Sequence, residues 1–172
     1  MRDINPELLL ALCIHTENKE IRLKRLQAMV ELFPDFAQAY NQIGILFSEL
    51  NDLSGARDFY AKAIESNPSY LEAQRNYGDT LVELGDYENG IRVFLKIIEL
   101  HPDDIISLLY MANLYFEVEK FTDALAFLQK VLKIDPNNES AHRLTETINQ
   151  TLSSIDSGDQ DSMKKFEQAN TK

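Results

Sequence analysis

The chain has 172 residues, of which 44% are hydrophobic, and this is enough for one ordinary folded core. Its 28 acidic and 17 basic side chains give a formal net charge of -11, which argues against a nucleic-acid-binding protein because phosphate contacts need clustered Lys and Arg. No apolar run is long enough to span a bilayer, so we expect no direct membrane insertion.

The stretch LLLALC, from Leu8 to Cys13, resembles the end of a lipoprotein signal. Its apolar region is very short, Asp3 and Glu7 stand where positive charge is expected, and Leu12 occupies a position that is normally small. We therefore interpret the stretch as part of a helix. Because Cys13 is the only cysteine, an internal disulfide and a cysteine metal cluster are excluded, and a reducing, cytoplasmic setting is expected.

Four prolines recur at intervals of 34 residues and divide the chain into similar segments. They are Pro34, Pro68, Pro102 and Pro136. A proline disfavours helix for the residue before it and removes a backbone donor, so each one is predicted to end a helix. The next residue is in every case a favoured N-cap, which predicts that another helix starts at once. These predicted caps are Asp35, Ser69, Asp103 and Asn137.

Each segment between prolines contains two helical patterns. In the first segment, apolar or small residues fall at i, i+3, i+4 and i+7, which is one face of a helix. They are Tyr40, Ile43, Gly44 and Phe47. Ala56, Tyr60 and Ala63 form the second pattern, and small residues such as Gly44 and Ala56 let the two helices approach closely. The same columns recur in the next two segments, which predicts an all-α stack of helical hairpins.

Short turns are expected between the two helices of each hairpin. Asn51 and Gly85 suit a left-handed turn residue, whereas Glu119 suits it poorly. Ser54 and Thr122 are predicted to cap the second helices that follow.

The two ends depart from the repeated pattern. At the start, Asn5 is predicted to be an N-cap and Pro6 the first helical residue. Near the other end, an apolar stripe with polar residues beside it predicts a capping helix with a polar outer side. The stripe consists of Ala141, Leu144, Ile148 and Leu152. From Ser153 onward the chain lacks apolar periodicity, so residues 153–172 are predicted to be a disordered tail.

The repeated columns resemble the tetratricopeptide repeat, a 34-residue unit with the pattern W-x2-L-G-x2-Y, A-x3-F and P. The segment AYNQIGILF…GARDFYAKAIESNP fills every column, with Tyr40 in place of Trp. The other units depart at Gln74, Ile97 and Met111. The resemblance implies a right-handed superhelical α-solenoid of antiparallel helix hairpins. Its expected parts are a divergent helix pair at 1–36, repeats at 37–70, 71–104 and 105–138, a capping helix at 139–152, and the tail.

In tetratricopeptide proteins the first helices line a concave face, and the resemblance implies where a peptide-binding groove would lie. The candidate groove residues are Asn41, Ile45, Ser48, Glu49, Arg75, Asp79, Val82, Glu83, Leu109, Asn113, Phe116, Glu117 and Arg143. Glu49, Glu83 and Glu117 would form an acidic row; the alternative is that they belong to an ordinary solvated face. Because the groove offers only two arginines against many acids, a basic or neutral partner segment with apolar anchors is expected.

No catalytic constellation, phosphate-binding loop or ligand-spaced histidine group is found, so we expect neither an enzyme nor a cofactor or metal site. The leading hypothesis is an interaction module, or adaptor, that holds a segment of a partner protein in its concave face. One alternative is a dedicated chaperone for a secreted or membrane-associated client. Another is a self-assembling scaffold that forms a homo-oligomer through the first unit, in which Leu8, Leu9 and Leu10 follow one another.

Overall fold

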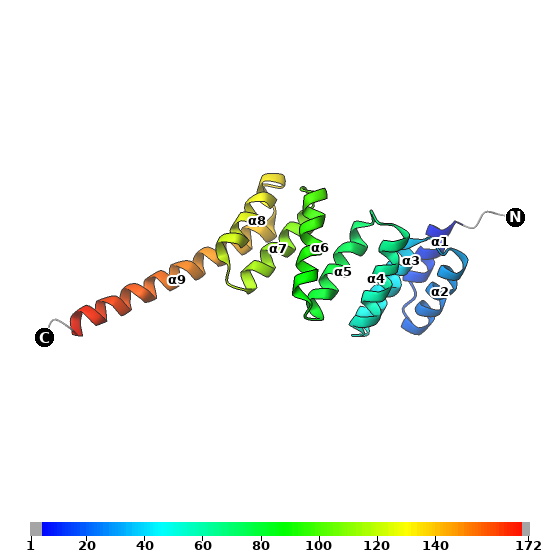
Figure 1. Cartoon of the computed structure of the whole chain (residues 1–172), viewed down its shortest axis with the longest axis horizontal. Coiled ribbons are helices and arrows are strands. Elements are labelled where there is room, and N and C mark those ends of the chain that lie inside the picture. The colour runs from blue at the N-terminus through cyan, green and yellow to red at the C-terminus, as the bar shows by residue number, and fades with distance from the viewer. Residues whose placement is uncertain (1–4, 170–172) are drawn as a thin grey trace. The chain divides into compact units, whose positions relative to one another are not determined.

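The computed structural model describes residues 5–169 and the side chains up to Ile155, and all secondary structure in this part of the chain is α-helical (Figure 1). The chain divides into two compact units, Met1–Leu100 and His101–Lys172, which are described separately. Unit 1 contains α1 (Pro6–Ile14), α2 (Lys19–Leu32), α3 (Ala37–Glu49), α4 (Leu53–Ser66), α5 (Leu71–Glu83) and α6 (Tyr87–Leu100). Unit 2 contains α7 (Ile105–Glu117), α8 (Phe121–Ile134) and α9 (Glu139–Ala169). Residues 1–4 of the predicted first helix pair and residues 170–172 of the predicted tail lie outside the described residues.

Unit 1 consists of three helix hairpins packed side by side. The hairpins are α1–α2, α3–α4 and α5–α6, and α2 and α4 each pack against the first helix of the next hairpin. In unit 2, α7 and α8 form a fourth hairpin, and α9 packs against both. The prediction of an all-α fold built from stacked hairpins is confirmed within each unit. No helix in residues 5–169 combines the length and apolarity needed to cross a membrane.

Close helix packing explains the small residue in the middle of α3. Gly44 is buried, and a Cβ atom added to it would lie 2.5 Å from Cε1 of Tyr60 on α4. Tyr60 itself is 3% exposed, so its ring fills the space that a larger residue would need. The same arrangement recurs at Gly78, whose added Cβ would lie 2.9 Å from Cε2 of Phe94 on α6. The glycine and aromatic columns are therefore paired by packing.

The proline seams are tight turns, and this moves the helix caps by one residue from the predicted positions. In each turn a backbone N–H donates to the carbonyl three residues earlier, for example Tyr70 to Asn67 at 3.1 Å. The proline occupies the second position of the turn, where its fixed φ is favourable. The predicted caps therefore occupy the third position of the turn rather than the N-cap. Asp35, Ser69, Asp103 and Asn137 were wrongly assigned as caps for this reason.

The residues that stand at the helix starts differ in their capping ability. Phe36 and Tyr70 precede α3 and α5 and make no side-chain cap. Asp104 caps α7 by accepting from the N–H of Ser107, and Asn138 accepts from that of Ala141 in α9. Caps of this kind contribute about 1 kcal/mol each. The side chains thus encode the starts of α7 and α9 more strongly than those of α3 and α5.

The turns inside the α3–α4, α5–α6 and α7–α8 hairpins use left-handed residues. Asn51, Gly85 and Glu119 have φ values of 61°, 86° and 58°, so Glu119 adopts the conformation although it is poorly suited to it. The predicted caps Ser54 and Thr122 are wrong, because α4 and α8 begin one residue before them. Asp52 caps α4 by accepting from the N–H of Gly55 at 2.9 Å, and Lys120 before α8 makes no side-chain cap.

Helix α9 departs from the prediction at its C-terminal end. It was expected to stop at Leu152 and to be followed by a disordered tail, whereas the structure continues it to Ala169. No proline interrupts this stretch, and the hydroxyls of Ser153 and Ser154 donate to the carbonyls four residues earlier. Serines engaged in this way are compatible with a continuous helix.

The outer face of α9 is polar. It corresponds to the face that α3, α5 and α7 pack against the second helices of their hairpins. The columns that hold Tyr40, Ile43, Gly44 and Phe47 in α3 hold His142, Thr145, Glu146 and Asn149 in α9. Three of these α9 side chains are exposed and Thr145 is half-buried. Ala141 and Ile148, by contrast, are fully buried on the opposite stripe. A helix with this distribution covers the hairpin of unit 2 and presents a solvated surface on its other side.

Candidate functional site

The predicted groove residues fall on equivalent pairs of first helices in the two units. Unit 1 holds eight of them on α3 and α5: Asn41, Ile45, Ser48, Glu49, Arg75, Asp79, Val82 and Glu83. Unit 2 holds five on α7 and α9: Leu109, Asn113, Phe116, Glu117 and Arg143. Figure 1 shows both helix pairs, and each is considered within its own unit.

Between α3 and α5 the structure corrects the prediction for Asn41. This residue is fully buried, and its amide is used within the protein. Asn41 Nδ2 donates to Glu72 Oε1 at 3.0 Å and to the Tyr70 hydroxyl at 3.4 Å, while Asn41 Oδ1 accepts from Asn76 Nδ2 at 2.9 Å. The Tyr70 hydroxyl also donates to Glu72 Oε2 at 3.1 Å. Asn41 therefore joins two helices and is inaccessible to a ligand.

This network also affects the pKa of the Tyr70 phenol. Burial, followed by the neighbouring Glu72 carboxylate, raises the pKa of Tyr70 to about 12. The phenol is thus held in its neutral, hydrogen-bond-donating form. Sequence reasoning missed Tyr70, Glu72 and Asn76 as partners of Asn41 because their contact depends on how neighbouring hairpins overlap, which helical periodicity alone does not specify.

The acidic row is only partly available to a partner. Glu49 Oε2 lies 2.9 Å from Nη2 of Arg22 and 3.2 Å from Nζ of Lys19, both on α2. Its charge is therefore compensated inside unit 1. Asp79 and Glu83 on α5 are exposed, and burial together with the charge of Asp79 raises the pKa of the Glu83 carboxyl group. Among the predicted acidic groove residues of unit 1, those left without an ion pair are therefore on α5.

Tyr60 lies beneath this acidic surface. Its pKa is raised by burial and then by the carboxylates of Asp79, Glu83, Glu72 and Glu49, in that order of effect. Four acids thus act on one buried phenol, and all four lie on α3 or α5, which gathers negative charge on these two helices. Negative potential of this kind favours the approach of positively charged segments.

The remaining predicted residues of unit 1 are half-buried. Ile45, Ser48 and Arg75 all have intermediate exposure. Val82 was predicted to be an apolar groove contact, but it packs toward the second helix of its own hairpin. A Cβ atom added to Gly90 of α6 would lie 2.5 Å from Cγ2 of Val82. Val82 therefore contributes at least as much to the hairpin as to the α3–α5 surface.

Unit 2 has an open cavity between α7 and α9. It has a volume of about 470 Å³ and is lined by Leu109, Asn113, Phe116, Ser140, Arg143, Leu144 and Thr147. Four of the five residues predicted for this unit meet here, and Glu117 is the exception. Ser140 and Leu144 were missed, although they lie three residues before and one residue after Arg143 on the same helix. Leu144 had been assigned to the apolar stripe alone.

The cavity combines an apolar base with polar groups at its edge. Leu109, Phe116 and Leu144 are half-buried, and the Phe116 ring is supported by Phe121, with ring centroids 5.9 Å apart. Asn113 Nδ2 donates to the carbonyl of Leu109 in its own helix at 2.9 Å. This bond fixes the amide, so that its oxygen can serve as an acceptor.

Arg143 supplies the positive charge of the cavity. Its side chain is exposed, and within the described residues the structure shows no ion pair to it. An apolar base with a few polar groups at its edge is the usual composition of a ligand-binding pocket. The described residues contain no group of three His, Cys, Asp or Glu side chains placed to hold a metal ion.

Comparisons with known proteins agree with these repeats. Residues 37–70 match one tetratricopeptide repeat model and residues 81–148 match another, which together cover more than half of the chain. The chain belongs to the tetratricopeptide repeat family. The repeat is generally a non-enzymatic protein-interaction fold, so the chain is assigned as a protein-interaction scaffold at this level.

Solved structures with a similar fold include several of MamA. MamA residues 41 to the end from Desulfovibrio magneticus RS-1 superimpose with a TM-score of 0.71 at 17% identity, covering 97% of this chain and 94% of that one. A MamA RS-1 ArsTM double mutant gives 0.70 at 18% identity, with coverages of 94% and 93%. Another MamA crystal structure gives 0.64 at 22% identity, with coverages of 77% and 74%. At these identities the likeness concerns the fold alone. No curated protein matches the sequence significantly.

Proposed function

We propose that this tetratricopeptide repeat protein is a non-enzymatic adaptor that binds a segment of a partner protein through an apolar anchor residue between α7 and α9. The observation that carries this proposal is the 470 Å³ cavity, in which Leu109, Phe116 and Leu144 offer apolar contact. At its edge, Arg143 would donate to a backbone carbonyl of the bound segment or to a polar neighbour of the anchor. The amide oxygen of Asn113 would accept from a backbone N–H of that segment.

The preferred partner segment is neutral or basic overall. Asp79 and Glu83 expose negative charge on unit 1, and the chain carries a net charge of -11, so an acidic segment would be repelled on approach. Buried apolar contact then prolongs the complex, because the main determinant of residence is the anchor in its cavity. The two contributions separate experimentally, since charge acts on the association rate and the anchor on the dissociation rate.

A synthetic peptide array that varies apolar, basic and acidic residues tests the proposal. We expect selection of neutral or basic peptides with one large apolar residue. Phe116→Ala should weaken binding of a selected peptide about tenfold or more, because truncating a central anchor contact typically costs at least about 1–2 kcal/mol. Glu117→Ala is the matched control, since Glu117 is exposed on the same helix and does not line the cavity.

Two results would contradict the proposal. One is a strong preference of the array for peptides that end in Asp or Glu. The other is unchanged affinity of Phe116→Ala for every selected peptide, which would show that the cavity is the wrong surface. Circular dichroism of the variant would verify that α7 remains folded.

A further inference from the structure

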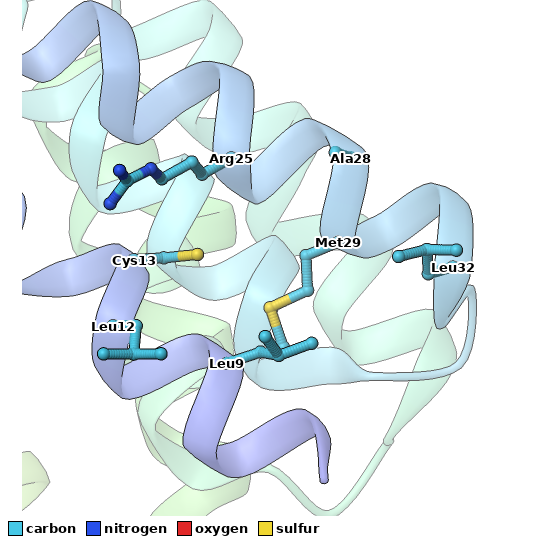
Figure 2. A pocket seen from close by; sticks show the side chains of 7 residues that line it. All are labelled: Leu9, Leu12, Cys13, Arg25, Ala28, Met29 and Leu32. Atoms are coloured by element: carbon cyan, nitrogen blue, oxygen red, sulfur yellow. The ribbon is translucent and has the colours of Figure 1, made fainter. Parts of the chain in front are cut away.

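The end of unit 1 carries an apolar groove that is separate from the cavity of unit 2. It has a volume of about 500 Å³ and lies between α1 and α2. Figure 2 shows that Leu9, Leu12 and Cys13 reach it from α1, and Met29 and Leu32 from α2. Cys13 and Met29 form its base, with exposed fractions of 7% and 3%. The groove is therefore built on side chains that belong to the packed interior.

The rims of this groove are unusually apolar for a protein surface. Leu12 is 60% exposed and Leu32 is 66% exposed, and no described residue covers them. Leu10, the next leucine of α1, instead packs against the core cluster of Cys13, Leu26 and Ile43. Leu10 therefore belongs to the core, whereas Leu9 and Leu12 belong to the groove. An exposed apolar patch over a hollow is typical of a protein–protein contact.

The groove is also distinguished by its charge. Among the described residues, Arg25 is the one charged residue that lines it, and no carboxylate does so. Arg25 Nη1 donates to the Thr16 hydroxyl at 2.8 Å, which holds the guanidinium at the groove edge. Helix α2 as a whole has four basic and two acidic residues, although the chain has a net charge of -11. An apolar helix flanked by acidic residues is the complementary occupant.

Helix α9 has these properties. Its stripe continues from buried Ile148 to Leu152 and Ile155, which are 36% and 50% exposed. The sequence of α9 contains six acidic residues against one Arg and two Lys, and three of the acids follow Ile155 within six positions. The described end of the α9 stripe is thus apolar and exposed, and the sequence that follows it is acidic.

We propose that the α1–α2 groove binds α9 of a second copy of the chain, with Leu152 and Ile155 against Leu12 and Leu32. This contact is heterologous, because one copy contributes the groove and the other the helix. Repetition of the contact produces open chains or closed rings rather than a single symmetric dimer. The surface differs from the α7–α9 cavity, so self-association and peptide binding are separable.

Two blocked variants test the contact. Leu12→Asp places a negative charge in the groove, and Ile155→Asp places one on the helix stripe. Each should be monomeric where the wild-type chain associates, with association about tenfold to a hundredfold weaker or more, since burial of a leucine or isoleucine side chain contributes this factor. An equimolar mixture of the two variants retains one intact groove and one intact helix, and should therefore form a dimer that does not grow further.

Sedimentation velocity over a wide concentration series measures these species. Leu50→Asp controls for charge at an exposed leucine outside the groove, and Gln150→Asp does so on the polar side of α9; both should associate as the wild type does. Added salt should weaken association, because the proposed contact joins opposite charges. A wild-type chain that stays monomeric throughout would overturn the proposal. So would blocked variants that assemble like the wild type, or a mixture in which both remain monomeric.

Discussion

The helix pairs α3–α5 and α7–α9 occupy equivalent positions two repeats apart, yet one is closed and the other open. In α3–α5, Asn41 meets Glu72 and Asn76 in a buried hydrogen-bonded network. The equivalent columns of α7–α9 hold Leu109, Ser140 and Leu144, and these three line the 470 Å³ cavity. The same register of helices can therefore be locked by polar contacts or left as an open cavity.

The difference depends on side-chain size and polarity in only a few columns. Glu72 reaches Asn41 on the neighbouring helix at 3.0 Å, whereas the same column of α9 holds the shorter Ser140, which lines the cavity. Leu109 replaces the amide of Asn41 by an apolar surface. A repeat protein can thus restrict binding to one part of its length without changing its backbone architecture.

The largest effect on stability is expected when the closed α3–α5 pair receives, at Asn41, the leucine that the open α7–α9 pair has in the same column. Asn41→Leu should lower the free energy of unfolding by about 2–3 kcal/mol, because polar groups at the start of α5 lose a buried partner. Leu109→Asn is the reciprocal variant and should cost less than about 1 kcal/mol, since Leu109 is half-buried beside an open cavity. Urea denaturation followed by circular dichroism measures both. Equal losses would show that the network does not distinguish the two pairs.

A somewhat smaller effect is expected at the hairpin contact beneath the closed pair. Gly44→Ala should cost about 1–2 kcal/mol, because its Cβ would lie 2.5 Å from the Tyr60 ring. The equivalent columns of unit 2 hold Ala112 and Leu128. Combining Gly44→Ala with Tyr60→Leu should therefore cost less than the sum of the single changes in a double-mutant cycle. Strict additivity would indicate that the two residues are not coupled by packing.

Ser107 offers a test in which the substitution is expected to increase stability. It is fully buried, and its hydroxyl has no hydrogen-bond partner among the described residues. Its column holds alanine in the other first helices, at Ala39, Ala73 and Ala141. We expect Ser107→Ala to raise the free energy of unfolding by about 0.5–1 kcal/mol, because an unpaired buried hydroxyl is removed. A loss of stability in thermal or urea denaturation would show that the hydroxyl is paired in solution.

The smallest effect concerns pH. Burial and the charge of Asp79 raise the pKa of Glu83, so the folded state binds this proton more tightly than the unfolded state does. Ionisation of Glu83 therefore lowers stability as pH rises above the unfolded value of about 4.3. Glu83→Gln should be slightly more stable than wild type at neutral pH, and the difference should vanish in more acidic solution. A difference that grows on acidification would contradict the assigned direction.

The sequence predicted the repeat and the helix pairs because both depend on local signals. Recurring prolines, the columns around Gly44 and Tyr60, and the left-handed residues Asn51 and Gly85 each act within one hairpin. The cap positions were wrong by one residue because the turn that proline favours includes the residue after it. The length of α9 was underestimated because weak apolar periodicity was taken as disorder, although no proline interrupts the helix.

The candidate site was predicted less completely because it depends on contacts between hairpins. Leu109, Asn113, Phe116 and Arg143 come together around one cavity. Asn41 is not on an open surface, because it is buried and bonded to residues more than thirty positions away along the chain. Helical periodicity places a residue on a face, but neighbouring side chains decide whether that face is open.

Hydrogen–deuterium exchange of the protein with an array-selected peptide tests the central claim most directly. If the open pair is the binding site, the peptide should protect backbone amides in segments 109–116 and 140–147 and leave segment 37–49 unchanged. Protection confined to α3 and α5, or to the second helices α4, α6 and α8, would contradict the assignment of the α7–α9 cavity as the binding site.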